Sequence, residues 1–322
     1  MAAAHKISFG SAVLMNINMM IGAGIFLLPT LMAEKAGNAS FIGWPLICVL
    51  FLPIVINIAK ATQIFPGEGG FFTYCQQTMG NQAAFICGWI YFLGYTGLVS
   101  LQMFGLRFEL CKIFPISPMT FNVFYICFLT ILALMQLKVI ERVQSSLTLL
   151  KLVPLLLVVL FFVFYWNPSF SFVGTSTRSI SYTIPLALFG FWGFEGCCNI
   201  AHLIKGGHKA ASKAILVGFF VTSIIYTLFH FGILHIMGAD NLAQYGVSSF
   251  VNYLGLSPKL LTALSAFISA SIIVAYMSAT FGVFIASTAN LYSMAKKNLL
   301  LGSKAIVKTN RYDRPVKAIL MK

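Results

Sequence analysis

Closely spaced glycines interrupt two apolar segments, and the interruptions could bind a small zwitterion. Gly22-Ala23-Gly24 interrupts the first segment, and three glycines within residues 190–196 interrupt a later one. A broken helix exposes backbone N–H groups at the positive end of its second half, which attracts a carboxylate. The other break would free carbonyl oxygens for an ammonium group. The pair predicts a site for an α-amino acid, unless the glycines serve only close helix packing.

Two charged residues lie inside apolar segments, where a charge costs about 2.5–3.5 kcal/mol unless it is paired or hydrated. Glu195 stands within the second interruption, and we predict that it is a protonatable gate or a hydrogen-bond anchor beside the broken helix. A structural, protonated glutamate is the alternative. Lys151 lies nine residues beyond Arg142, about 13.5 Å deep, which exceeds the reach of a snorkelling lysine. Its cation could replace a bound sodium ion, with its own proton as the coupling ion.

These features fall at one depth. Gly22 lies twelve residues from Glu34, or about 18 Å, and Glu195 lies ten residues from Lys205, or about 15 Å. The hydrocarbon layer of a membrane is about 30 Å thick. Both interruptions and Lys151 are therefore predicted near the membrane midplane, as expected for a transporter substrate site.

The composition requires a membrane to surround these elements. Hydrophobic residues make up 59% of the 322-residue chain, charged residues 9%, and the mean hydropathy is +0.90. These values exclude a soluble domain, because most helices would be apolar on every face. With about 20 residues for each crossing, we predict an all-α polytopic membrane protein with about eight transmembrane helices. Their expected ranges are 9–32, 41–62, 83–106, 119–137, 144–166, 182–204, 213–237 and 260–289.

The net charge and the cysteines exclude further classes of protein. The net charge of +14 resides in short loops and in the segment 290–322, so it predicts topology with both termini cytoplasmic rather than a nucleic-acid partner. The protein is expected in a bacterial-type inner membrane, with an uncleaved first span.

Seven cysteines include no C-x-x-C pair, so no metal or other cofactor is predicted. The sequence contains no nucleophile–base set or phosphate loop, so we do not predict an enzyme.

Several motifs resemble the amino acid–polyamine–organocation (APC) superfamily of transporters. Ile21–Pro29 resembles the first-helix motif of that family almost letter for letter, and Phe191–Glu195 resembles its sixth-helix motif. Three further stretches resemble the loop after helix 2, helix 5 and the end of helix 8, namely Pro66–Gly70 with Tyr74, Val143–Pro154 and Asn290–Ala295. The first and fifth helices are most similar to the basic amino acid/polyamine antiporter branch.

The resemblance implies a 5+5 inverted-repeat fold of the leucine-transporter type, with the transporter domain at 1–289. It also implies a secondary active permease or exchanger of amino acids or related amines, proton-linked and working by alternating access. The substrate-binding residues would then be Gly22, Ala23, Gly24, Tyr91, Phe189, Phe191, Trp192 and Gly193. In that set Ala23 and Gly24 would contact the carboxylate, the backbone of 191–193 the amino group, and Phe189 would be an aromatic gate. Glu195 and Lys151 would serve gating and proton coupling.

The chain departs from the family in length. The family usually has twelve helices and its core needs ten, so eight helices suggest a chain truncated after the eighth. Residues 290–322 resemble a cytoplasmic loop before a ninth helix. A transport-inactive remnant and a binding or sensing module of the same fold are therefore the alternatives to a transporter. A homodimer and a monomer both remain open.

Overall fold

The computed structural model describes residues 6–22, 24–111, 114–164 and 177–322, and within these ranges the regular structure is helical. The first half contains α1 (Phe9–Met20), α2 (Gly24–Ala36), η1 (Gly37–Ile42), α3 (Gly43–Ile64), α4 (Phe71–Cys111), α5 (Pro118–Ala133) and α6 (Leu137–Phe164). The second half contains α7 (Thr177–Ser181), α8 (Thr183–Gly190), α9 (Gly196–Asn199), η2 (Ala201–Leu203), α10 (Gly207–Met237), α11 (Ala239–Tyr245), η3 (Val247–Tyr253), α12 (Pro258–Lys296), α13 (Ser303–Ile306) and α14 (Val316–Leu320).

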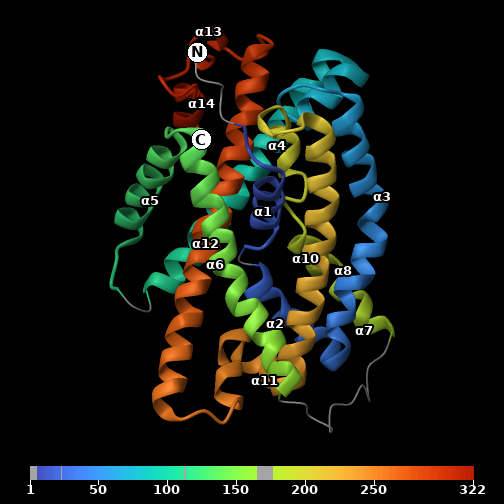
Figure 1. Ribbon diagram of the computed structural model, residues 1–322, viewed down its shortest axis with the longest axis vertical. Helices are drawn as coiled ribbons and strands as arrows, with labels where there is room; N and C mark the ends of the chain where they lie inside the picture. The colour runs from blue at the N-terminus through green and yellow to red at the C-terminus, as the bar shows by residue number, and fades with distance from the viewer. Residues whose placement is uncertain (1–5, 23, 112–113, 165–176) are drawn as a thin grey trace.

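The helices form an elongated bundle that a membrane can enclose (Figure 1). Among the described residues, five helical stretches are long and apolar enough to cross a membrane, and three shorter apolar helices accompany them. Helix α12 packs along α4, while α10 contacts α1, α3 and α6. The start of α1 and the helices α13 and α14 lie at the same end of the bundle (Figure 1). This arrangement confirms the prediction of an all-α polytopic membrane protein.

Local sequence explains where several helices begin. The Ser8 hydroxyl accepts a hydrogen bond from the backbone N–H of Ser11 at 3.1 Å and so caps α1. Ser117 caps α5 in the same way, and Pro118 stands at the first helical position. Side-chain acceptors and an N-terminal proline both suit helix starts, because the first N–H groups of a helix have no intrahelical partner.

Several helix boundaries differ from the expected ranges, and at α4 and α12 the helix extends beyond the apolar segment. Helix α4 begins at Phe71 rather than near residue 83, with a break at Gly80, whose φ of 86° and ψ of −177° are open to glycine. Helix α12 continues to Lys296, beyond the expected boundary at 289. Both differences arise because polar sequence near a membrane surface can remain helical, whereas the prediction followed hydropathy alone.

The segment after α12 is folded against the bundle. Asn310 Nδ2 donates to the Leu134 carbonyl at 2.9 Å, and Arg314 Nε donates to the Ala133 carbonyl at 3.0 Å. These bonds occupy carbonyls at the end of α5. Burial lowers the pKa of the Arg314 guanidinium to about 10, which leaves it protonated at pH 7, so its charge faces the negative end of α5.

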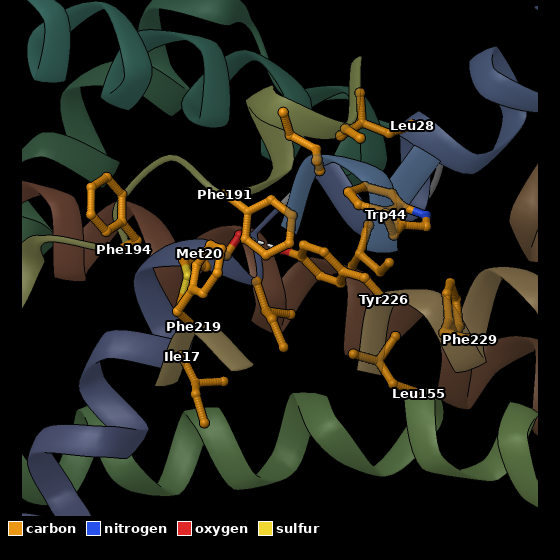
Figure 2. Close-up of a cluster of buried hydrophobic side chains, with 14 of the residues drawn as sticks. Ile17, Met20, Leu28, Trp44, Leu155, Phe191, Phe194, Phe219, Tyr226 and Phe229 are labelled. Atoms are coloured by element: carbon orange, nitrogen blue, oxygen red, sulfur yellow. Dashed lines mark hydrogen bonds between the residues drawn. The ribbon is translucent and has the colours of Figure 1, made fainter. Parts of the chain in front are cut away.

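Aromatic side chains fill the core between α3, the broken segment after α8, and α10. Trp44 packs against Tyr226 with ring centroids 4.7 Å apart, and Phe191 packs against Phe219 at 4.9 Å. Figure 2 shows these rings meeting beside the end of α1, near Met20. Because lipid is as apolar as these side chains, close packing rather than water exclusion holds the helices together.

The contact between α4 and α12 depends on glycines that admit bulky neighbours. A Cβ atom added at Gly88 would lie 2.5 Å from Met294 Sδ, and one at Gly105 would lie 2.3 Å from Tyr276 Cε1. By contrast, a Cβ added at Gly97 of the same helix would meet no atom within 4 Å. Gly88 and Gly105 therefore permit the two helices to approach, as small residues do in membrane proteins.

The first prediction concerns this interface. Replacement of Gly105 by Ala should destabilise the protein by about 1–3 kcal/mol, because the added methyl group forces Tyr276 to move. The measurement is the thermal denaturation midpoint of the detergent-solubilised protein, followed by size-exclusion chromatography after heating. Gly97→Ala is the matched control and should leave the midpoint unchanged or slightly higher. Equal midpoints for the two variants would contradict the packing described here.

Candidate functional site

The first predicted break separates α1 from α2. Helix α1 ends at Met20, the backbone at Ile21 leaves the helical region with φ −78° and ψ 85°, and α2 begins at Gly24. Gly22 N–H bonds back to the Met20 carbonyl at 2.9 Å, and Gly22 and Gly24 are buried. Ala23 lies outside the described residues. The break exposes the end of α1 and the start of α2 at one point in the bundle interior.

The second predicted break separates α8 from α9. Residues 191–195 form consecutive turns, and Gly193 has a φ of +97°. A Cβ added at Gly193 would lie 2.9 Å from Met19 Cβ, so glycine permits both the backbone conformation and the close approach to α1. The Phe191 and Gly193 carbonyls accept hydrogen bonds from Phe194 and Gly196 within the turns. The prediction was that the break leaves these carbonyl oxygens free. Each instead accepts one hydrogen bond and keeps a second lone pair.

Tyr226 of α10 joins the two breaks. Its hydroxyl lies 2.7 Å from the Met20 carbonyl oxygen at the end of α1 (Figure 2). It also lies 3.0 Å from the Gly190 carbonyl oxygen at the end of α8. The side chain is fully buried. Sequence reasoning missed this residue, because a tyrosine inside an apolar segment resembles ordinary packing. The hydroxyl fixes the spacing of the two helix ends.

Lys151 of α6 occupies the end of α1. Its ammonium group donates to the Asn18 carbonyl at 2.8 Å, to the Asn18 side-chain oxygen, and to the Ile21 carbonyl. The side chain is fully buried, so it does not reach a membrane surface. Asn18 in turn donates to the Ser278 carbonyl of α12 at 2.8 Å. A cation at the negative end of α1 satisfies carbonyls that the break leaves without helical partners.

Glu195 lies at the other end of the second break and is buried. Its carboxylate accepts a hydrogen bond from the Tyr95 hydroxyl of α4. The rings of Tyr91 and Tyr95 stack with centroids 4.2 Å apart and an angle of 20°. Asn199 of α9 donates from Nδ2 to the Tyr91 hydroxyl at 2.7 Å. Glu195 therefore belongs to a polar group that spans α4 and α9.

Two cavities adjoin the breaks, and Trp192 lines both of them. The central cavity, of about 30 Å³, is lined by Met19, Met20, Gly22, Gly24, Leu98, Leu101, Gln102, Phe189, Gly190 and Trp192. The aromatic cavity, of about 250 Å³, is lined by Phe51, Phe71, Ile90, Tyr91, Gly94, Tyr95, Trp192, Gly193, Phe194 and Glu195. The central cavity holds water molecules at most, so this conformation has no room for an amino acid between the breaks.

The predicted residues that the structure describes thus divide among four places. The central cavity is lined by Gly22, Gly24, Phe189 and Trp192. The aromatic cavity is lined by Tyr91, Trp192, Gly193 and Glu195. Phe191 is fully buried in the aromatic core, so only its backbone faces the break. Lys151 lies behind the break and lines neither cavity. Gln102 of α4 was missed, although its amide lies beside Gly22, 3.6 Å from the position of an added Cβ atom.

A network at the end of the bundle where α1 begins holds the second broken helix in place. The backbone of Ile7 pairs with residues 203 and 205 through hydrogen bonds of 2.9 and 2.8 Å, and Lys6 Nζ donates to the His202 carbonyl at 2.7 Å. Glu68 forms an ion pair of 2.7 Å with Lys296 and lies 3.8 Å from His202 Nε2. These contacts close that end of the bundle.

Comparison with known proteins relates the chain to a transporter family. The family model described as amino acid permease matches residues 7–321. The serine/threonine exchanger SteT of Bacillus subtilis is 23% identical over 251 residues, which are 73% of this chain and 56% of SteT. The L-methionine/branched-chain amino acid exporter YjeH of Escherichia coli is 32% identical over 72 residues, 22% of this chain and 17% of YjeH. The matched part of the chain thus covers little more than half of SteT and less than a fifth of YjeH.

A solved structure of a Na⁺-coupled sialic acid symporter, in a substrate-bound outward-open state, shares the fold. It matches with a TM-score of 0.64 at 11% identity, covering 97% of this chain and 71% of that chain. The likeness confirms the predicted leucine-transporter-type fold.

The second prediction concerns Lys151. Replacement by Met should lower the thermal midpoint, since the Asn18 and Ile21 carbonyls lose their donor at a cost of about 1–3 kcal/mol each. Lys151→Gln should fall between Met and the parent protein, because an amide retains a donor. Leu150→Met, at a half-exposed position on the same helix, serves as the control and should change little. A Met variant as stable as the parent would show that the ammonium group is not needed there.

Proposed function

Because the chain belongs to the amino acid permease family, we propose that it moves amino acids or related amines across a membrane as a secondary transporter. The observation that carries the proposal is the meeting of two broken helices, α1/α2 and α8/α9, at the Tyr226 hydroxyl. Paired breaks at one depth supply opposite helix ends to one ligand. SteT and YjeH, whose names state amino acid exchange and export, support this substrate class.

In this proposal the central cavity is the substrate site. The N–H groups at the start of α2, from Gly24 onward, receive the carboxylate, and the turn at 191–193 receives the ammonium group. Phe189 and Trp192 cover the bound molecule from the side of α8. The small central volume corresponds to a closed conformation, so alternating access must widen it from one side at a time.

Glu195 and Lys151 supply the charges that a proton-linked cycle requires. Glu195 is buried beside both Gly193 and the aromatic cavity, so its protonation changes the charge next to the moving turn. Lys151 places its amino group, which can bind and release a proton, against carbonyls of α1, where carbonyl oxygens could otherwise hold a sodium ion. We therefore propose that protons, rather than sodium, drive the cycle.

The membrane placement follows the charge distribution. We propose a bacterial-type inner membrane with the end that carries α13, α14 and the start of α1 in the cytoplasm, because basic residues concentrate there. A binding or sensing module of the same fold would share this placement and would differ in showing no flux.

The third prediction tests transport and the role of Glu195 together. Purified protein in proteoliposomes should exchange labelled amino acid against internal unlabelled amino acid in a saturable manner, and an imposed pH gradient should accelerate net uptake. Glu195→Gln should reduce proton-driven uptake at least tenfold, since the amide cannot bind and release a proton.

Glu34→Gln is the matched control, because Glu34 is exposed and pairs with neighbouring Lys35 at 2.8 Å. It should retain full uptake. Absence of saturable exchange for every amino acid and amine tried would overturn the transporter proposal, and binding without flux would favour the sensing module. If the Glu195→Gln variant keeps full pH-driven uptake, the proposed coupling role of Glu195 is wrong, while the transporter proposal stands.

A further inference from the structure

His230 of α10 is a buried imidazole that contacts polar groups of two other helical segments. Trp44 Nε1 of α3 donates to His230 Nδ1 at 3.0 Å, and Ser40 Oγ of η1 lies 3.2 Å from His230 Nε2. All three side chains are fully buried, and α10 is one of the helices long and apolar enough to span a membrane. An ionisable side chain at such a position is costly, so it indicates a functional role.

Counting hydrogens fixes the protonation of this imidazole. The indole N–H of Trp44 can only donate, so His230 Nδ1 must be the acceptor. The single hydrogen of the neutral ring is then on Nε2 and points to the Ser40 oxygen. A protonated ring would place two N–H groups against each other at Nδ1. His230 is thus held as a neutral ring, and its hydrogen bond fixes the orientation of the Trp44 indole.

Trp44 transmits this orientation to the point where the two broken helices meet. Its ring packs against the ring of Tyr226 with centroids 4.7 Å apart (Figure 2). It also packs against the end of α8, since a Cβ added at Gly190 would lie 2.6 Å from Trp44 Cζ3. Trp44 therefore contacts both residues of the hydrogen bond between Tyr226 and Gly190. Phe191 also packs against Tyr226, with centroids 5.6 Å apart, but a phenyl ring has no hydrogen-bonding group to fix its orientation.

The Tyr226 hydroxyl is sensitive to small displacements. It has one hydrogen, and the carbonyl oxygens of Met20 and Gly190 lie 2.7 and 3.0 Å away. Carbonyls cannot donate, so this hydrogen serves both helix ends. A hydrogen bond weakens as its distance and angle depart from the preferred values, so a shift of the ring toward one carbonyl releases the other. The spacing of the two breaks therefore depends on how firmly Tyr226 is held.

We propose that His230 is a positioning residue for substrate binding, because through Trp44 it holds Tyr226 where one hydroxyl bridges the ends of α1 and α8. The inference rests on the proposed function only in taking the two breaks as the substrate site. His230 lines neither the central cavity nor the aromatic cavity. It acts by hydrogen bonding and packing, with no change in its own protonation.

The fourth prediction concerns the hydrogen bonds of these rings. Ultraviolet resonance Raman spectra of the lipid-reconstituted protein report hydrogen bonding of an indole N–H and of a tyrosine hydroxyl. Subtraction of the Trp44→Phe or Tyr226→Phe spectrum isolates the bands of one residue. His230→Leu should shift the Trp44 and Tyr226 bands together. His230→Gln should preserve both, because an amide can accept from Trp44 and donate to Ser40. Trp44→Phe should shift the Tyr226 bands although His230 is present.

Substrate affinity measures the consequence of this positioning. The probes are labelled L-serine and L-methionine, amino acids that the names of SteT and YjeH state. Tyr226→Phe and His230→Leu should each weaken equilibrium binding about three- to tenfold, as expected for one lost hydrogen bond. The double variant should bind no more weakly than Tyr226→Phe alone, since His230 acts through the Tyr226 hydroxyl. A merely structural role of His230 would give additive losses.

His235→Leu is the matched control. His235 is also a buried histidine of α10, five residues beyond His230, and its ring packs against Phe162 with centroids 5.0 Å apart. It lies outside the contacts that lead from His230 to Tyr226. This variant should leave both the Tyr226 bands and the affinity for the probes unchanged.

Three results would overturn the proposal: unshifted Tyr226 bands in His230→Leu, equal shifts in the two His230 variants, or additive losses of affinity in the double variant. The outcome is distinct from that of the transport assay. Shifted bands in a protein that neither binds nor moves amino acids would overturn the transporter function, while the positioning of Tyr226 by His230 would stand. Flux with unshifted bands would overturn only the role of His230.

Discussion

Backbone groups that a broken helix releases inside a membrane must find partners within the protein, because lipid offers none. This constraint organises the centre of the molecule. Lys151 satisfies the Asn18 and Ile21 carbonyls, and Tyr226 reaches the carbonyls of Met20 and Gly190. Each partner comes from a different helix, so the breaks also determine how α6 and α10 approach α1.

The same constraint explains why the polar chemistry is confined. Lys151, Tyr226 and Glu195 are each hydrogen-bonded within the protein, and the surrounding core is aromatic and closely packed. Trp192 stands between the central and aromatic cavities, so a movement of the turn that carries it would change both volumes together. A site for a charged ligand can exist here because the protein, rather than the lipid, surrounds it.

The sequence predicted the helical class and the two breaks, because hydropathy and local glycine spacing are short-range features. It also singled out Lys151 and Glu195, since charge inside an apolar run is visible without a structure. Tyr226 and Gln102 could not be found in this way. Their importance comes from partners far away in sequence, and a tyrosine or an amide in an apolar segment is common enough to carry no information by itself.

The pairing of Ile7 with residues 203 and 205 has a consequence for how the protein is made. These backbone groups are separated by almost two hundred residues and meet through two hydrogen bonds. A ribosome adds residues in order, at about 5–20 per second. The first helix therefore enters the membrane many seconds before the segment that pairs with Ile7 exists. Until then its leading end must stay unpaired, or be held by the insertion machinery, so closure of this end of the bundle is a late step of synthesis.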